Sequence, residues 1–346
     1  MIKSRSEIIQ KHFGDLLPSF RFEQINHALF DREIKGWNEI STLPKDVREW
    51  LEAHLPFASF TCVALLQSQD KSTKKALMQT SDNAEIETVL MKNSRGHWSI
   101  CVSSQVGCAM NCSFCATGKM GLTRNLIADE IIDQYRFWNA AIGHDERISN
   151  IVFMGMGEPL ANYVEVKKAL AKLLMYTDIG KTKITVSTVG ILPRLKMLLD
   201  DPEWPHVRLA VSLHSVDQKK RASFMPSTTL TFLDDLADWS KAYLKKFGNR
   251  THHLTFEYLL MKGVNDDKVD AKRLATFVRS IGRVKVNIMS YNSTGVFAAP
   301  DEELVKKFGD VLRSVGIDVT RRRSLGSDIY AACGQLANKK KACIDG

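Results

Sequence analysis

The 346-residue sequence is 44% hydrophobic and 25% charged, which is typical of a folded protein with a sizeable core. It has no uncharged apolar stretch of about eighteen residues, and charged residues interrupt its start. We therefore expect neither a membrane span nor a secretory signal, and we expect a cytoplasmic protein. The 48 Lys and Arg outnumber the 39 Asp and Glu, and the net charge of +9 favours a polyanionic partner.

Residues 1–90 are predicted to form a small N-terminal α+β domain. Apolar residues recur at helical spacing in 22–30, and a proline opens a second predicted helix at 43–51. Alternating apolar and polar residues then predict three strands, at 60–66, 75–79 and 86–90.

Residues 91–346 are predicted to form one larger domain of the α/β class, because strand and helix patterns alternate six times. Such repeats favour a parallel (β/α)6 architecture, closed or partly open, with functional residues beyond the carboxyl ends of the strands. The predicted strands are 98–103, 150–154, 183–188, 207–213, 253–260 and 284–289, and the predicted helices are 128–141, 164–174, 192–199, 230–244, 268–281 and 302–315.

Three closely spaced cysteines, Cys108, Cys112 and Cys115, follow the first strand of this repeat. A structural zinc ion needs a fourth Cys or His nearby, which the sequence lacks, although a ligand from a distant segment stays an alternative. A four-iron cluster with one iron left open fits three thiolates better. The C-x3-C-x2-C spacing resembles the signature of radical S-adenosylmethionine (SAM) enzymes, in which SAM binds the open iron and the aromatic residue before the last cysteine, here Phe114, lies against its adenine.

Polar residues and glycines stand where the next predicted strands end. A plain strand-to-helix turn or a polar strand end would explain each of them separately, but parallel strands bring all of their carboxyl ends to one rim. Beside a SAM-type motif, Gly157 and Glu158 look like a loop that binds the amino group of SAM. The candidate rim residues are Gly157, Glu158, Ser187, Ser212, His214 and Asn292.

The other cysteines differ in their surroundings. Cys62 lies in an alternating strand pattern and is predicted to be a small buried side chain. Cys101 lies on the first strand of the repeat, where a buried structural thiol stays an alternative. Cys333 lies among small residues beside Gly334, in a segment that could carry a moving thiol. An odd total of seven cysteines disfavours a disulfide framework, so any disulfide is expected to be catalytic.

Several of these motifs together resemble the RlmN and Cfr family of radical SAM RNA methyltransferases, over nearly the whole chain. The matching segments are 101–108, 112–115, 155–159, 212–214 and 332–336. The resemblance implies a partly open radical SAM barrel, an RNA-binding role for the N-terminal domain, a 4Fe-4S cluster on the three cysteines, and SAM contacts at the rim residues. It also implies methylation of an adenine carbon in 23S rRNA, C2 or C8, and in the first case also of the adenosine beside the anticodon of tRNA.

The resemblance further implies a role for three residues and the use of two SAM molecules per turnover. Cys333 would take a methyl group from one SAM, and a 5′-deoxyadenosyl radical from a second would remove a hydrogen from that methyl group. The carbon would then add to adenine, and Cys101 would release the product by forming a disulfide with Cys333. Glu87 aligns with the proposed proton acceptor. We expect the protein to be a monomer that receives electrons from a donor such as flavodoxin or ferredoxin.

Two departures from the family pattern leave open which adenine carbon is methylated. Asn292 is followed by serine rather than proline, and residues 325–328 read Leu-Gly-Ser-Asp, which is nearer to Cfr than to RlmN. Segments 101–104 and 157–159 are nearer to RlmN, so C2 methylation is favoured and C8 methylation is the alternative. A radical SAM enzyme for a non-RNA substrate and a non-enzymatic iron–sulfur RNA-binding protein are more remote alternatives.

Overall fold

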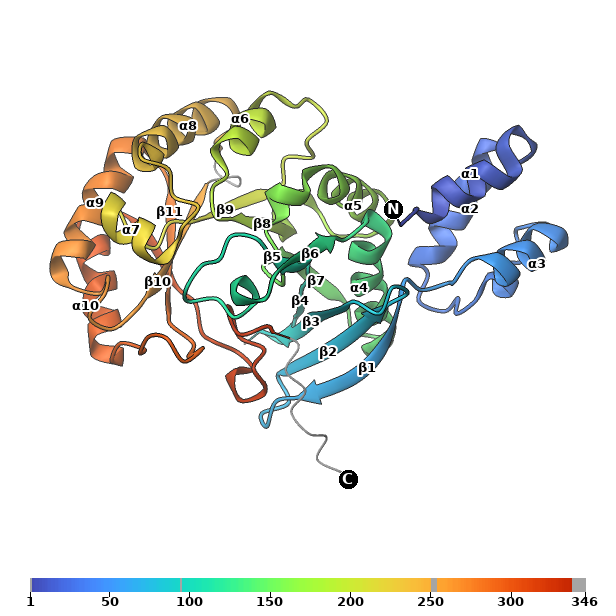
Figure 1. Ribbon diagram of the computed structural model, residues 1–346, viewed down its shortest axis with the longest axis horizontal. Coiled ribbons are helices and arrows are strands. Elements are labelled where there is room, and N and C mark those ends of the chain that lie inside the picture. Colours follow the sequence, from blue (N-terminus) through green and yellow to red (C-terminus); the bar gives the residue numbers. More distant parts are fainter. Residues whose placement is uncertain (1, 94, 250–253, 338–346) are drawn as a thin grey trace.

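The computed structural model describes residues 2–93, 95–249 and 254–337 and confirms the predicted α/β class. A single ten-stranded sheet curves through the molecule in the order β1-β2-β3-β4-β7-β8-β9-β10-β11-β12 (Figure 1). From β4 onward all neighbouring strands are parallel. This part comprises β4 (Trp98–Cys101), β7 (Ile148–Phe153), β8 (Ile184–Thr188), β9 (Arg208–Ser212), β10 (Thr255–Leu260), β11 (Lys285–Ser290) and β12 (Asp318–Arg321).

The six predicted helices cover the outer face of the parallel strands, as Figure 1 shows. They are α4 (Ala128–Ala141), α5 (Tyr163–Tyr176), α6 (Leu192–Asp200), α8 (Phe232–Phe247), α9 (Lys268–Ile281) and α10 (Glu302–Arg313). The structure adds α7 (Gln218–Phe224) and the seventh parallel strand, β12, which the sequence did not predict. The first residues of the predicted strand 253–260 include His253, which lies outside the described residues. No helix in the described ranges is both long and apolar enough to cross a bilayer.

The N-terminal residues divide into a helical part and a sheet part. Helices α1 (Arg5–Phe13), α2 (Ser19–Phe30) and α3 (Lys45–His54) enclose a core of their own. Strands β1 (Phe60–Gln67), β2 (Thr73–Thr80) and β3 (Glu85–Lys92) instead extend the barrel sheet, because β3 pairs antiparallel with β4. The domain boundary at residue 90 stays a prediction, and the strand pairing runs across it.

A buried ionic network fastens the helical part to the barrel. The guanidinium of Arg5 forms an ion pair with Asp133 on α4, and the backbone amide of Arg5 donates to Asp129, also on α4 (2.7 Å). The backbone amide of Ser59, just before β1, donates to the same Asp133 carboxylate (2.7 Å). Asp133 therefore joins α1, the start of β1 and α4 at one point.

Candidate active site

The cysteine loop lies at the mouth of the barrel, between the strands of a separate hairpin formed by β5 (Gln105–Cys108) and β6 (Gly121–Asn125). Gly107 has φ 77°, and a Cβ at this position would lie 1.9 Å from the carbonyl oxygen of Gly121. Only glycine therefore allows the hairpin to close directly before Cys108. A turn from the amide of Cys115 to the carbonyl of Cys112 (3.0 Å) then folds the loop back toward the barrel.

The three cysteines border one open cavity, here called the first cavity. Ten of the residues singled out in the sequence line it together, although they come from five separate segments of the chain. These residues are Cys108, Cys112, Phe114, Cys115, Gly157, Glu158, Ser187, Ser212, His214 and Cys333. The convergence follows from the parallel sheet, whose strands end at this rim.

The three thiols fit a multi-iron cluster better than a single metal ion. Burial raises the pKa of Cys108 to about 11 and also raises the pKa values of Cys112 and Cys115, so binding as thiolates requires a strongly cationic partner. In the described ranges, no three His, Cys, Asp or Glu side chains converge on one point as a single zinc ion requires. Three thiolates that line one cavity could instead hold a four-iron cluster and leave one iron open to a ligand.

Glu158 is held at the first cavity by its neighbours. Its carboxylate accepts hydrogen bonds from the amides of Leu160 (3.0 Å) and Val189 (2.8 Å), and its own amide donates to the side chain of Gln105 (2.8 Å). Gly157, with φ 100°, allows this approach because a Cβ there would lie 2.5 Å from the Cβ of Gln105. The result is a buried, fixed acceptor suited to the amino group of a ligand.

The carboxyl of Glu158 gives a testable pH dependence. Burial raises its pKa from 4.5 to about 7, so the folded cluster-free protein binds a proton that the unfolded chain has already lost between these values. The contribution of Glu158 to the free energy of unfolding is therefore present below pH 4.5 and falls by up to about 3 kcal/mol as the pH rises to 7.

We expect urea unfolding of the cluster-free protein at pH 5, 6 and 7 to show this decline relative to the Glu158→Gln variant, which cannot titrate at this position. Equal slopes of unfolding free energy against pH in the two proteins would contradict the assignment.

His214 is a neutral, oriented group at the rim. Burial lowers its pKa to about 3, and its Nδ1 accepts a hydrogen bond from the amide of Leu259 (3.1 Å), which leaves the proton on Nε2. The ring of Phe114 meets the His214 ring edge-to-face at a centroid distance of 5.0 Å. The two rings form an aromatic corner that suits a nucleobase or ribose.

Arg221 on α7 supports the rim and was missed in the sequence. Its buried guanidinium donates to the carbonyls of Val189 (2.8 Å), Ser212 (3.0 Å) and Leu213 (3.0 Å), which lie at the ends of β8 and β9. Nothing in the local pattern distinguishes this arginine from the lysines before it, because its role depends on carbonyls from two distant strands.

A second cavity meets the first at Cys333, Met154 and Met289, which line both. Cys101 and Asn292 also line the second cavity, and the Asn292 side chain donates to the backbone carbonyl of Cys333 (3.1 Å). The structure therefore places Asn292 beside the backbone of Cys333 rather than among the residues that line the first cavity. Cys101 is buried and its pKa is raised to about 12, whereas Cys333 is exposed.

The two thiols are free, as are the other cysteines in the described ranges. Basic residues gather around the second cavity, and its lining includes Lys71, Lys92, Arg321, Arg322 and Arg323. This charge suits a polyanion whose reacting group reaches the two thiols.

Glu87 lies on β3, close to these cavities but in the lining of neither. Its buried carboxylate forms an ion pair with Lys75 (2.7 Å) and accepts a hydrogen bond from the amide of Ala337 (2.9 Å). Ala337 ends the segment that carries Cys333, residues 326–337, here called the Cys333 loop. The structure therefore joins Glu87 to the Cys333 loop through the backbone rather than through an open face of the site.

Comparisons with known proteins agree with this geometry. Residues 102–275 match the model of the radical SAM superfamily. The chain is 39% identical to the probable dual-specificity RNA methyltransferase RlmN of Aquifex aeolicus (strain VF5), over 96% of each chain, and 40% identical to the ribosomal RNA large subunit methyltransferase N of Nitrosopumilus maritimus (strain SCM1), over 92% of each. A crystal structure of a radical SAM methyltransferase from Sphaerobacter thermophilus matches with TM-score 0.88 and 38% identity, over 96% of each chain.

Sequence identity at this level over nearly the full length shows the family. The convergence of the cysteine loop and the rim residues on one cavity agrees with it. The chain belongs to the RlmN and Cfr family of radical SAM RNA methyltransferases.

Proposed function

We propose that the protein methylates C2 of an adenosine in the peptidyl transferase centre of 23S rRNA and of the adenosine beside the anticodon of tRNA, with Cys333 as the methyl carrier. The observation that supports it most directly is the position of Cys333, which lines both the cavity with the cysteine loop and the basic cavity with Cys101. A group carried on this sulfur can meet one ligand in each cavity.

The proposed role of each residue follows from the cavity that it lines. Cys108, Cys112 and Cys115 would hold a 4Fe-4S cluster, and Glu158, Ser187, Ser212, His214 and Phe114 would bind SAM. The cluster and SAM supply, when bound, the radical that removes a hydrogen atom from a methyl group. Flavodoxin or ferredoxin is the proposed source of the electron.

The two thiols carry out the transfer. The sulfur of Cys333 would attack the methyl group of one SAM, lose its proton and release S-adenosylhomocysteine. After hydrogen abstraction, which uses a second SAM, the methylene radical would bond to the adenine carbon. The adduct would then lose the proton of that carbon and one electron, which the oxidised cluster would accept. The sulfur of Cys101 then attacks the sulfur of Cys333, so that a disulfide forms and the methylated base leaves. An adenine carbon is too weak a nucleophile to take the methyl group directly, which is why a carrier and a radical are needed.

Glu87 is the proposed proton acceptor for the adenine ring. Because the Ala337 amide and Lys75 occupy its carboxylate, the segment around Ala337 has to move before Glu87 reaches the base. This requirement links the proton transfer to a movement of the Cys333 loop.

The test is product identification. The anaerobically reconstituted protein is incubated with SAM, a reductant and unmodified 23S rRNA or tRNA, and the digested RNA is analysed by mass spectrometry against standards. We expect 2-methyladenosine. Finding 8-methyladenosine would move the protein to the Cfr type of reaction, and the absence of any methyladenosine from both RNAs would reject the proposal.

A further inference from the structure

The Cys333 loop is fixed at several main-chain points, and one set of fixing groups comes from the segment after the cysteine motif. The amide of Ala116 donates to the carbonyl of Gly334 (2.7 Å), and the hydroxyl of Thr117 donates to the carbonyl of Leu336 (2.6 Å). These bonds hold the part of the loop after the carrier thiol against the segment that would bind the cluster.

The second set of fixing groups comes from β2 and β3. The Lys75 ammonium donates to the carbonyl of Tyr330 (3.3 Å), three residues before Cys333, and the Glu87 carboxylate accepts from the amide of Ala337 (2.9 Å), four residues after it. The two contacts therefore bracket the carrier thiol along the chain.

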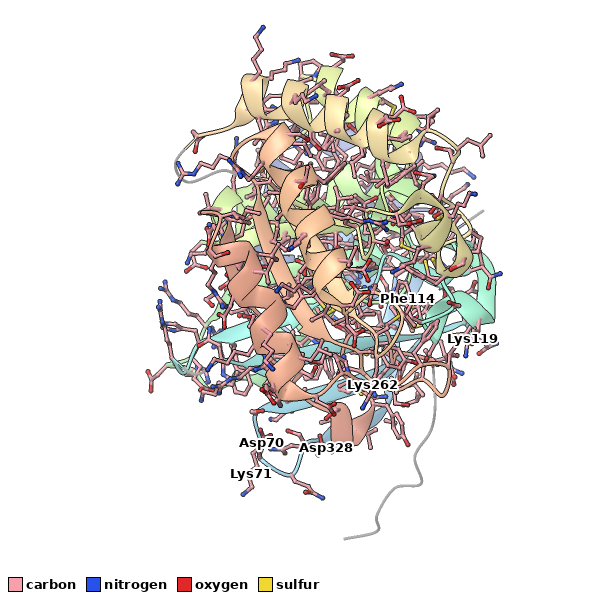
Figure 2. All side chains as sticks on the ribbon, turned by 90° about the vertical axis from the view of Figure 1, so that its left-hand side faces the viewer. Asp70, Lys71, Phe114, Lys119, Lys262 and Asp328 are labelled. Atoms are coloured by element: carbon pink, nitrogen blue, oxygen red, sulfur yellow. The ribbon has the colours of Figure 1, made fainter. Side chains whose placement is uncertain are left out.

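The turn between β1 and β2 adds a contact at the start of the loop. The amide of Gln69 donates to the carboxylate of Asp328 (2.9 Å), and Figure 2 shows Asp328 beside Asp70 and Lys71 of that turn. The N-terminal strands thus contact the Cys333 loop from its beginning to its end.

Lys75 and Glu87 also pair with each other. Their charged atoms are 2.7 Å apart, and their side chains are only 3% and 1% exposed. Glu87 pairs with Leu77 in the β2–β3 register, so Lys75 lies diagonally opposite on the same face. A buried ion pair adds little net stability compared with apolar side chains of similar size, because both charges lose their hydration. Stability alone does not account for this pair. Its remaining bonding capacity is directed to the backbone of the loop on either side of Cys333, at Tyr330 and Ala337.

We propose that Lys75, acting with Glu87, is a positioning residue that clamps the Cys333 loop on both sides of Cys333 and so holds the carrier thiol at the junction of the two cavities. The inference rests on the proposed function for the role of Cys333 as carrier. It is separate from the role of Glu87 as proton acceptor, and it gives the N-terminal strands a part in catalysis besides any contact with RNA.

The first test measures amide hydrogen exchange of residues 326–337 in the full-length, cluster-reconstituted protein. In Lys75→Met we expect exchange in this loop to rise by about tenfold or more, because the Tyr330 contact is lost and Glu87 is left unpaired. Lys75→Arg should restore part of the protection. Lys74→Met is the matched control, because Lys74 is half-buried and lies on the opposite face of the strand. In this variant the Cys333 loop should exchange at the wild-type rate.

A double variant separates the Tyr330 contact from the Ala337 contact and guards against misfolding. Lys75→Met with Glu87→Gln leaves no unpaired buried charge, and the glutamine can still accept from Ala337. We expect faster exchange around Tyr330 but not at Ala337. Unchanged exchange over the whole loop in both variants, with cluster absorbance and melting temperature as in the wild type, would overturn the clamp.

The second test measures methylation of Cys333 by SAM without RNA, from the mass of the Cys333 peptide. Lys75→Met should lower the rate by about tenfold or more while the dissociation constant of SAM stays within about twofold, because the first cavity is intact. A normal methylation rate in this variant would overturn the clamp. If wild-type Cys333 takes up no methyl group, the proposed function fails. If amide exchange of the loop in the Lys75 variants still changes as expected, the clamp stands.

Discussion

Replacing the proposed carrier thiol should abolish RNA methylation while leaving the rest of the site intact. In Cys333→Ala we expect no methylated adenosine, a loss of at least about a thousandfold, because the alanine has no sulfur to carry the carbon. The cluster absorbance and the affinity for SAM should stay close to those of the wild type, because Cys333 only borders the first cavity at its rim. Mass spectrometry of digested RNA measures the first quantity, and spectroscopy and calorimetry measure the other two.

Cys62→Ala is the matched control, since Cys62 is a partly buried thiol on β1 that lines neither described cavity. This variant should methylate RNA normally. Methylated RNA from Cys333→Ala would contradict the two-thiol scheme, whatever the control does.

Replacing the second thiol should stop the reaction one step later. In Cys101→Ala we expect a covalent protein–RNA species to accumulate in nearly stoichiometric amount, because the bond between the carrier carbon and adenine forms but no thiol attacks Cys333. Its buried position and raised pKa make Cys101 a poor free nucleophile, which suits a thiol that reacts only with a sulfur held beside it. Denaturing gel electrophoresis with labelled RNA detects the species.

Ribonuclease digestion should leave a modified nucleotide on the Cys333 peptide of Cys101→Ala. Repeated turnover in this variant, with no such adduct, would instead make Cys101 a structural thiol.

The candidate site was predictable to the extent that it lies at the ends of parallel strands. Gly157, Ser187 and His214 lie far apart in sequence, but the repeated strand and helix pattern was enough to place them at one rim. Asn292 shows the limit of that reasoning. It follows the last predicted strand as expected, yet its side chain bonds to the Cys333 backbone in the second cavity, and no local pattern reports such a contact.

Other features were not predictable because they depend on distant partners. Strand β12 has four residues in a polar, arginine-rich stretch at the sheet edge, so it shows no apolar run. Lys75 stands in an alternating strand, where a lysine usually indicates a solvent-facing position. Its burial becomes evident only once Glu87 and the backbone of Tyr330 are placed around it.

The continuity of the sheet constrains how this chain could have acquired its N-terminal part. Helices α1 to α3 have their own core and end before β1, so a segment upstream of Phe60 could be exchanged or rebuilt with the main sheet left whole. A division at residue 90 would instead separate β1 to β3 from β4 and leave the edge of β4 unpaired. In gene fusion or domain shuffling of this architecture, the junction is therefore expected near residue 58. Strands β1 to β3 are expected to be inherited together with the barrel.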